Sequence, residues 1–263
     1  MNYYSIVNYS IDSLRNFLIL MQNSGFQTKT FSEYVSMVDH DSTSSRALLL
    51  RHDVDADMEA ALSLALTEHE LGIKSTYFFM TQSPVYNVFS RRNLQIVKRI
   101  ISMSHEIGLH SDVCDQHSSQ DSIFYHVKNE ILSFSRMIGI DINSVSFHQP
   151  STNSLNYASD YSHDGFISAY NDWRIKKLKY ISDSNRRKTV SEITQECLTP
   201  AEDNQDIGVQ LLIHPMWWIY NEATTDLVWN RVIEENLFAT QEQLLATEMA
   251  FGNRRKFKVI SGE

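Results

Sequence analysis

Histidine and aspartate side chains follow one apolar segment after another along this chain of 263 residues. They are His52, Asp53, Asp55, His110, Asp112, His148, Asp183 and His214. Neutral imidazole and carboxylate are side chains that bind a borderline divalent metal such as zinc. Any single one of them is more often a helix cap or a structural hydrogen-bonding group, so it is their repeated placement that predicts a metal site.

A metal ion held by three protein side chains keeps a position open for water, which makes such a site catalytic. The metal brings the pKa of bound water near 7 and polarises a substrate carbonyl. A second carboxylate can act as general base, and a histidine on the opposite side can protonate a leaving amine. The residue types therefore predict metal-dependent hydrolysis. An amide fits best as the substrate bond, because its leaving nitrogen must be protonated by an acid.

Short strands must position these side chains. The candidate strands are near-continuous apolar runs, which is typical of parallel strands buried on both faces. They are Ala47–Leu50, Ser75–Met80, Glu106–Leu109, Ser144–Phe147, Gly165–Tyr170, Leu178–Ile181 and Val209–Ile213. Segments with helical spacing of apolar residues are Ser10–Ser24, Asp57–Leu71, Arg91–Met103, Ile123–Ile138 and Trp229–Met249.

The alternation of strands and helices predicts an α/β fold with a parallel sheet, either doubly wound or closed into a barrel. No glycine-rich loop follows the first strand, which disfavours the nucleotide-binding doubly wound fold. In a parallel barrel the carboxyl ends of all strands meet at one rim, where the chemistry sits. Because five of about seven expected strands end in His or Asp, we expect one site at that rim.

The ordered motifs over residues 46–218 resemble the polysaccharide deacetylase superfamily, also called the NodB-homology or carbohydrate esterase family 4 proteins. The motif-bearing segments are Arg51-His52-Asp53-Val54-Asp55, His105–Ser111, Phe147–Ser151, Lys179–Ser184 and Leu211–Trp218. The resemblance implies a distorted (β/α)7 barrel that hydrolyses N-acyl groups on amino sugars. Their combination looks like a divergent branch found among surface-polysaccharide biosynthesis proteins.

The resemblance also implies a role for each matching residue. Asp53 would be the catalytic base, and Asp55 and His110 would be metal ligands. His214 would be the general acid, and Asp183 would orient or tune a catalytic partner. The metal would be one divalent ion, with zinc as first choice and cobalt, manganese or nickel as alternatives.

The chain departs from the family at the third ligand. Cys114 stands where the second metal histidine is usual, so Asp112, Cys114 and His148 remain candidates. We favour His148, which occupies a motif where the family usually has an arginine that fixes the base. Arg51 and His52 receive no definite role, and packing or a salt bridge is the expected account of them.

Aromatic residues near the last motif predict substrate contacts. Trp217 and Trp218, with Pro150 of the third motif, are the expected substrate-binding residues, because flat rings stack on the C–H faces of sugars. Trp173 and Tyr220 would add flat apolar surface. Core packing beneath the rim is the alternative for these rings.

The overall composition limits the classes of protein to which this chain can belong. The apolar fraction of 42% and the charged fraction of 21% are those of a globular protein, and a net charge of −9 without a long basic run argues against a nucleic-acid partner. Only two cysteines occur, and no apolar window approaches the roughly 18 residues of a membrane span. With no signal-like N-terminus, the expected location is the cytoplasm.

The sequence thus predicts one domain over residues 1–263, with an N-terminal helical extension (1–45), a motif-bearing barrel (46–218) and a C-terminal helical segment (219–263). The expected activity is removal of an acetyl or formyl group from an amino sugar or glycan precursor of a cell-surface polysaccharide. The alternatives are an inactive deacetylase-like protein that binds sugar, or a metal-dependent hydrolase of a non-sugar amide. The oligomeric state is not set by the sequence.

Overall fold

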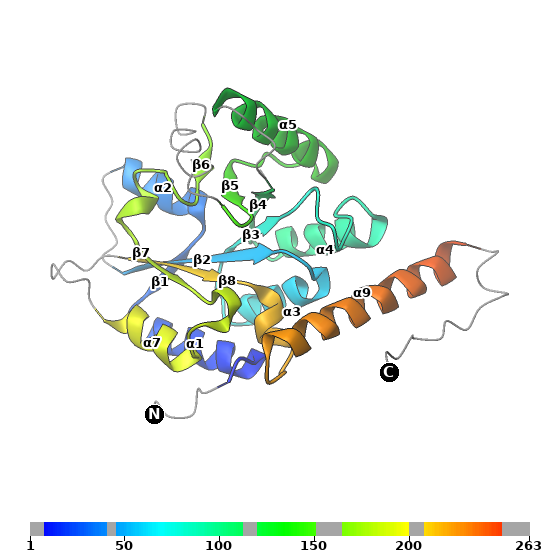
Figure 1. The fold of residues 1–263 in the computed structure, drawn as a ribbon. Coiled ribbons are helices and arrows are strands. Elements are labelled where there is room, and N and C mark those ends of the chain that lie inside the picture. The colour runs from blue at the N-terminus through cyan, green and yellow to red at the C-terminus, as the bar shows by residue number, and fades with distance from the viewer. Residues whose placement is uncertain (1–7, 41–45, 113–119, 151–164, 200–207, 249–263) are drawn as a thin grey trace.

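A computed structural model describes residues 8–40, 46–112, 120–150, 165–199 and 208–248. In this part of the chain an eight-stranded parallel sheet curves into a barrel-like core with helices on its outside (Figure 1). The strands are β1 (Gln27–Lys29), β2 (Ala47–Val54), β3 (Thr76–Phe79), β4 (Glu106–Ser111), β5 (Ser144–Phe147), β6 (Ile167–Ser168), β7 (Lys179–Ser182) and β8 (Val209–Ile213). The α-helices are α1 (Ile11–Asn23), α2 (Phe31–Asp39), α3 (Met58–Glu70), α4 (Arg91–Ser102), α5 (Gln120–Ile138), α7 (Val190–Leu198), α8 (Pro215–Ile219) and α9 (Thr225–Thr247).

The strand order is β6-β5-β4-β3-β2-β8-β7, with β1 attached to β2. The seven-stranded path is that of a distorted (β/α)7 barrel, open between β6 and β7 in the described residues. The predicted fold class is therefore confirmed. All seven expected strands are present within a few residues, whereas β1, α2, α7 and α8 were not predicted. Strand β1, within the expected N-terminal extension, pairs with β2 of the motif-bearing segment.

Strand β2 lies inside the sheet, with a partner along each of its edges. Along one edge it pairs with β8, in a register that joins Leu48 to Val209 and His52 to Ile213. Along its other edge it pairs first with β1 and then with β3. Since both edges are occupied over most of its length, the register of β2 is fixed, and with it the face to which each side chain points.

Successive side chains of β2 point to opposite faces of the sheet. Leu48 and Leu50 join the large apolar core between the sheet and the outer helices. Ala47 and Leu49 belong to a second apolar cluster, to which Phe31 and Phe78 also contribute. Because the odd-numbered positions share this second face, Arg51 and Asp53 follow Leu49 as the inner face becomes polar.

Helix α2 lies across the amino ends of the strands. Its first turn carries a capping box between Thr30 and Glu33. The backbone N–H of Phe31 donates to Oγ1 of Thr76 at 3.1 Å, and that of Ser32 donates to a carboxylate oxygen of Glu106 at 2.9 Å. Thr76 and Glu106 begin β3 and β4, so α2 covers the end of the barrel opposite the predicted site.

A buried polar cluster lies between β2 and α3, on the outer face of the sheet. Glu68 of α3 faces Nε2 of His52 at 2.7 Å and accepts hydrogen bonds from Ser75 and Tyr77 at 2.6 and 2.8 Å. Nδ1 of His105 lies 2.9 Å from the same Ser75 hydroxyl. We call these five residues the outer cluster; the side chains of His52, Glu68 and His105 are fully buried.

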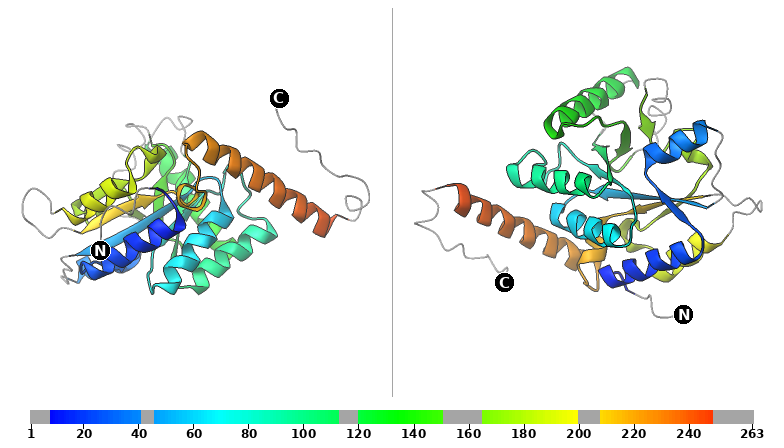
Figure 2. Two further views of the ribbon diagram at one scale, coloured as in Figure 1. Left: turned by 90° about the horizontal axis from the view of Figure 1, so that it is seen from below. Right: turned by 180° about the vertical axis from the view of Figure 1, so that it is seen from behind.

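Helix α9 extends away from the body of the molecule (Figure 2). Its first half is anchored through the fully buried Val228 and Val232 and through a hydrogen bond from Asn236 to the carbonyl of Ala56. The predicted closing helix is thus present, and it begins four residues earlier than expected. Among the described helices none is both long enough and apolar enough to cross a membrane.

Candidate active site

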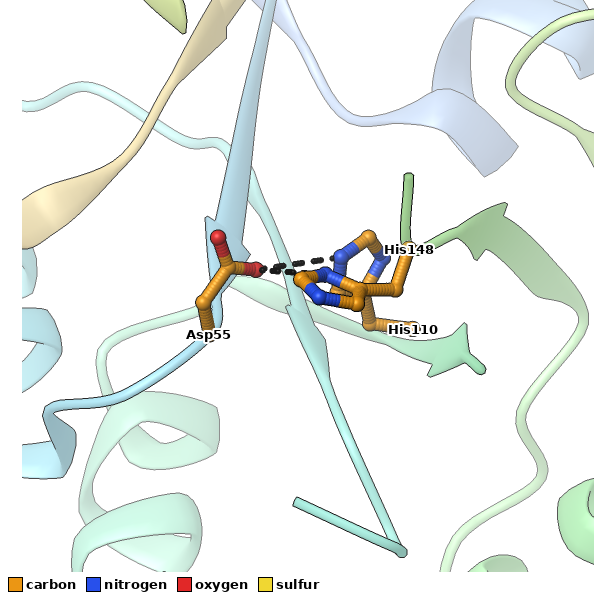
Figure 3. Close-up of side chains that lie close together, drawn as sticks. All are labelled: Asp55, His110 and His148. Atoms are coloured by element: carbon orange, nitrogen blue, oxygen red, sulfur yellow. Dashed lines mark ion pairs between the residues drawn. The ribbon is translucent and has the colours of Figure 1, made fainter. Parts of the chain in front are cut away.

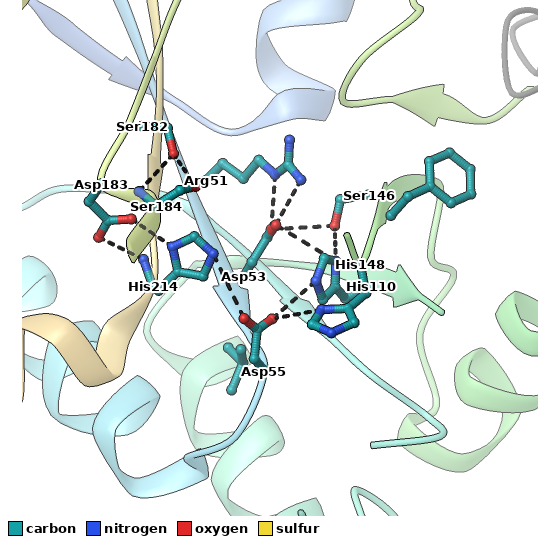
Figure 4. A network of polar contacts seen from close by, with 12 residues as sticks. Arg51, Asp53, Asp55, His110, Ser146, His148, Ser182, Asp183, Ser184 and His214 are labelled. Carbon is teal, nitrogen blue, oxygen red and sulfur yellow. Dashed lines mark hydrogen bonds and ion pairs between the residues drawn. The ribbon is translucent and has the colours of Figure 1, made fainter. Parts of the chain in front are cut away.

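A cavity of about 320 Å³ opens at the carboxyl ends of the strands. Its lining includes Asp53, Asp55, His110, His148 and His214. These side chains arrive from four different elements, at or just after the ends of β2, β4, β5 and β8. As Figure 4 shows, they surround a common space, with Asp53 and Asp55 between the histidines. The predicted residues therefore lie together at the carboxyl ends of the strands, as expected for a parallel barrel.

Asp55, His110 and His148 form a cluster that could hold a metal ion (Figure 3). One ligand atom from each lies within 4.8 Å of the others. Oδ1 of Asp55 is 3.1 Å from Nε2 of His110 and 3.5 Å from Nδ1 of His148. Ligands at about 2.1 Å from a tetrahedral metal lie about 3.4 Å apart, so this spacing fits one ion.

A serine orients one of these histidines. Oγ of Ser146, on β5, lies 2.7 Å from Nδ1 of His110 and donates to Oδ1 of Asp53 at 3.3 Å. A histidine that donates from one ring nitrogen keeps the other free for a metal, and such partners fix the ring orientation. Ser146 therefore turns Nε2 of His110 toward Asp55 and links His110 to Asp53.

Arg51 holds Asp53 in a fully buried ion pair. Its Nε and Nη2 donate to the two oxygens of Asp53 at 2.9 and 2.7 Å, and Nη2 also donates to the hydroxyl of Tyr170 at 2.6 Å. This bidentate geometry fixes the orientation of a carboxylate far better than a single hydrogen bond does. The arginine missing from the third motif thus has a counterpart two residues before Asp53, and the expected salt bridge of Arg51 is present.

Asp183 holds His214 on the opposite side of the cavity. One carboxylate oxygen lies 2.6 Å from Nδ1 of His214, and the other accepts from the backbone N–H of His214 and from the indole of Trp218, both at 2.9 Å. Nε2 of His214 lies 3.8 Å from Asp55. His214 therefore presents Nε2 to the cavity across from the possible metal cluster.

These contacts set the ionisation of the site. Burial opposes the charge of Asp53, but Arg51 outweighs it and lowers the pKa of this carboxyl. Burial also opposes the charge of Asp55, whose pKa is lowered by the neighbouring imidazoles of His110, His148 and His214. Burial would lower the pKa of His214, yet the charge of Asp183 and its hydrogen bond raise it to about 9. Both carboxylates are thus ionised at neutral pH, and His214 keeps its proton.

The three candidates for a third ligand differ in position. His148 belongs to the possible metal cluster, and the nearby carboxylate of Asp55 raises its pKa. Asp112 is described but does not belong to that cluster. Cys114 lies outside the described residues. The assignment of His148 stays a prediction that this geometry permits.

The predicted substrate-binding residues do not share one environment. Pro150 and Trp217 line the cavity, although Trp217 is only 2% exposed. Trp218 is fully buried, packs against Tyr9 with ring centroids 4.7 Å apart, and binds Asp183 through its indole nitrogen. It therefore supports the Asp183–His214 pair and offers no ring face to a sugar. Trp229 lines the cavity and was not predicted.

Two residues at the cavity have left-handed backbone conformations. Gln149 has a φ of 40° and Asn185 a φ of 53°, and both line the cavity. Such conformations are costly for residues other than glycine and persist where the surrounding structure imposes them, often at functional sites. Gln149 directly follows His148 in the chain, so its backbone conformation helps to set where the His148 side chain lies.

The fold is that of the carbohydrate esterase family 4 (CE4), the polysaccharide deacetylases with NodB homology, as the motif resemblance implied. A CE4 esterase from Streptococcus mutans superposes with a TM-score of 0.51 at 14% identity, over 83% of this chain and 91% of that one. A Streptococcus pyogenes deacetylase in complex with acetate gives a TM-score of 0.48 at 12% identity, over 80% and 83%.

A CE4 family pseudoenzyme from Bacillus anthracis gives a TM-score of 0.45 at 13% identity, over 77% of this chain and 66% of that one. No protein-family model matches the chain, and no curated protein matches it. At these identities the likeness establishes the shared fold alone, so activity must be argued from the site itself.

Proposed function

We propose that this protein is a metal-dependent deacylase that removes an acetyl or formyl group from the nitrogen of an amino sugar. The observation that carries the proposal is the arrangement of three groups around one cavity. Asp55, His110 and His148 form the possible metal cluster, Asp53 is a fixed carboxylate beside it, and the Asp183–His214 pair faces it. Metal, base and acid would thus lie on the sides that amide hydrolysis requires.

The donor set fits a borderline divalent ion, for which zinc is the first choice and cobalt, manganese or nickel are alternatives. When bound, such an ion supplies Lewis-acid polarisation of the acyl carbonyl and makes water more acidic. Asp55, His110 and His148 would hold it, and Ser146 supports His110. The spacing of the three donor atoms is the structural basis for this assignment.

The protein's own residues would carry the proton transfers. Asp53, ionised and aimed by Arg51, would take a proton from the attacking water. His214, protonated at neutral pH, would deliver a proton from Nε2 to the leaving nitrogen. Asp183 keeps the imidazole oriented and stabilises its positive charge, so the acid is ready before substrate arrives.

The direct test measures acyl release from N-acetylglucosamine and its short oligomers by protein loaded with Zn²⁺. Removing the metal by chelation, or Asp55→Ala, should abolish release, and added Zn²⁺ should restore the chelated wild type. Asp141→Ala is a matched control, because Asp141 is an exposed aspartate away from the cavity. Full activity after metal removal would contradict the mechanism.

Three alternatives give different outcomes in the same experiment. An esterase, which is what the name of the Streptococcus mutans neighbour calls that protein, would cleave an acyl ester in preference to the amide. A non-sugar amide hydrolase would act on simple N-acyl amides and not on sugars. A protein that binds sugar without cleaving it would release no acyl group with any metal.

We further propose that the whole chain forms one polysaccharide-deacetylase-like domain and that its substrate is an intermediate of cell-surface polysaccharide synthesis. The motif combination around Asp53, His148 and His214 supports this narrower placement. Turnover of a monosaccharide or short precursor in preference to a long polymer would agree with it.

A further inference from the structure

We propose that Trp229, in the first turns of α9, is the platform on which a sugar ring of the substrate stacks. The inference rests on the proposed function for the substrate class and adds a residue outside the recognised motifs. Trp229 lines the same cavity as the possible metal cluster and the Asp183–His214 pair. It is therefore placed to contact the part of the substrate that does not react.

Exposure distinguishes Trp229 from the other three tryptophans of the chain. Trp218 is fully buried and Trp217 is 2% exposed, so neither presents a ring face. Trp173 is 53% exposed but does not line the cavity. Trp229 is 38% exposed and does line it. It is the one tryptophan that combines an accessible ring with a position at the site.

The indole of Trp229 is held in place from behind. Its ring meets that of Trp217 nearly at a right angle, 89° between planes, with centroids 6.0 Å apart. The neighbouring Val228 is fully buried, and Thr224 caps the helix by accepting the N–H of Leu227. A ring that is already fixed loses little freedom when a ligand binds, so its contacts add directly to affinity.

The cavity lining matches a neutral sugar. Pro84 and Val85 add apolar surface, whereas Gln149, Ser184 and Asn185 offer polar groups. A sugar ring likewise presents C–H faces for an aromatic ring and hydroxyl edges for hydrogen bonds. No lysine or arginine is among the described residues that line the cavity, so apart from the possible metal cluster and His214 this lining offers the substrate ring stacking and neutral hydrogen bonds.

A second observation points to a ligand at this wall. The indole nitrogen of Trp217 is buried and has no hydrogen-bond partner in the described part of the chain. Buried donors are nearly always satisfied in native proteins, by protein groups or by ordered water. Trp217 also lines the cavity, so a substrate hydroxyl that reaches this nitrogen would supply the missing acceptor.

The test compares Trp229→Ala, Trp229→Phe and Trp173→Ala with the wild type, using N-acetylglucosamine oligomers of two to four sugars. We expect Trp229→Ala to raise KM about tenfold with little change in kcat, as the loss of one aromatic contact would. Trp229→Phe should recover most of the affinity, and Trp173→Ala should behave as wild type. Thermal unfolding of each variant verifies that the fold is intact.

A binding measurement separates this inference from the proposed function. Dissociation constants for the same oligomers are measured by calorimetry on Asp53→Asn, with and without Trp229→Ala. Tenfold weaker binding without acyl release by the wild type would support the platform and contradict the proposed activity. Unchanged KM and unchanged binding in Trp229→Ala, or no binding of any oligomer, would overturn the platform.

Discussion

Two buried polar clusters lie on opposite faces of strand β2, and they contain nearly the same kinds of side chain. The outer cluster surrounds Glu68 with two histidines, a serine and a tyrosine, and it is sealed between the sheet and α3. The inner group around Asp53 and Asp55 also has histidines, a serine and a tyrosine, but it borders the cavity. One position along the strand decides which cluster a residue joins.

The clusters differ in how completely their carboxylates are satisfied. Both oxygens of Glu68 have close protein partners, and its side chain is fully buried. Asp55 is 15% exposed at the cavity, and its Oδ1 faces two histidine nitrogens at 3.1 and 3.5 Å, a spacing that leaves room for an ion between them. Residue type alone therefore does not mark a functional site; incomplete coordination beside an accessible space does.

The largest expected effects separate the two clusters: a substitution in the inner group should lower activity, and one in the outer cluster should lower stability. Asp55→Ala should lower kcat/KM by at least about a thousandfold with little change in the free energy of unfolding, because it removes a ligand at an open site. Glu68→Ala should lower the free energy of unfolding by about 3–5 kcal/mol, because it leaves buried donors unpaired. Urea unfolding and steady-state kinetics measure both effects.

Glu70→Ala is the matched control for Glu68→Ala, since Glu70 lies on the same helix and is 61% exposed. Its loss should change the free energy of unfolding by no more than about 0.5 kcal/mol. A Glu68→Ala protein as stable as this control would show that the outer cluster has no structural role.

Arg51 is expected to give the next largest effect. Arg51→Lys keeps a positive charge but cannot make the two-pronged contact with Asp53, so kcat should fall by about ten- to a hundredfold. The pKa of Asp53 should rise, and the acidic limb of the pH–rate profile should move to higher pH, because the base must lose its proton to act. An unchanged profile would show that Arg51 does not control the base.

Asp183→Asn should move the opposite limb. The pKa of His214 is raised to about 9 chiefly through Asp183, so the protonated acid form persists up to that pH in the free protein and is lost above it. A bound cation beside Asp55 would lower this limit. Without the negative charge, the pKa should fall toward its ordinary value of about 6.5 and the alkaline limb should move to lower pH. A pH profile of kcat/KM measures the shift.

The smallest expected effect concerns Ser146. Ser146→Ala removes the partner of Nδ1 of His110, so metal affinity should fall by about tenfold while the fold is retained. Competition with a chromogenic zinc chelator measures the affinity. Ser111→Ala is a control on the neighbouring strand, because Ser111 binds Glu130 of α5 instead of the cavity residues. Equal metal affinities of the wild type and both variants would show that Ser146 does not support the metal site.

The sequence was sufficient for the strands and for the gathering of His and Asp at one rim, because continuous apolar runs and strand-end residues are local signals. The pairing of Arg51 with Asp53 was also readable in principle. Residues two apart on a strand share a face, but the first strand was expected to end at Leu50 and it continues to Val54.

Other features could not be read because they depend on packing across the chain. Trp217, Trp218 and Trp229 differ in exposure through contacts with Tyr9 and between α8 and α9 that no local pattern encodes. Helix α2 is an intermediate case. Its capping box, Thr30 with Glu33, is a sequence signature, whereas its place across the barrel end requires the contacts with Thr76 and Glu106.

The pairing of β2 with β8 has a consequence for how the chain folds. Leu48 pairs with Val209, so β2 obtains its partner on this edge only after most of the chain has been synthesised. Such distant pairings slow folding, because loop-closure entropy is lost before the contacts form. The ion pair of Arg51 and Asp53 would then be sealed late. A fragment that stops before residue 209 would expose one edge of β2, and we expect it to aggregate instead of retaining partial activity.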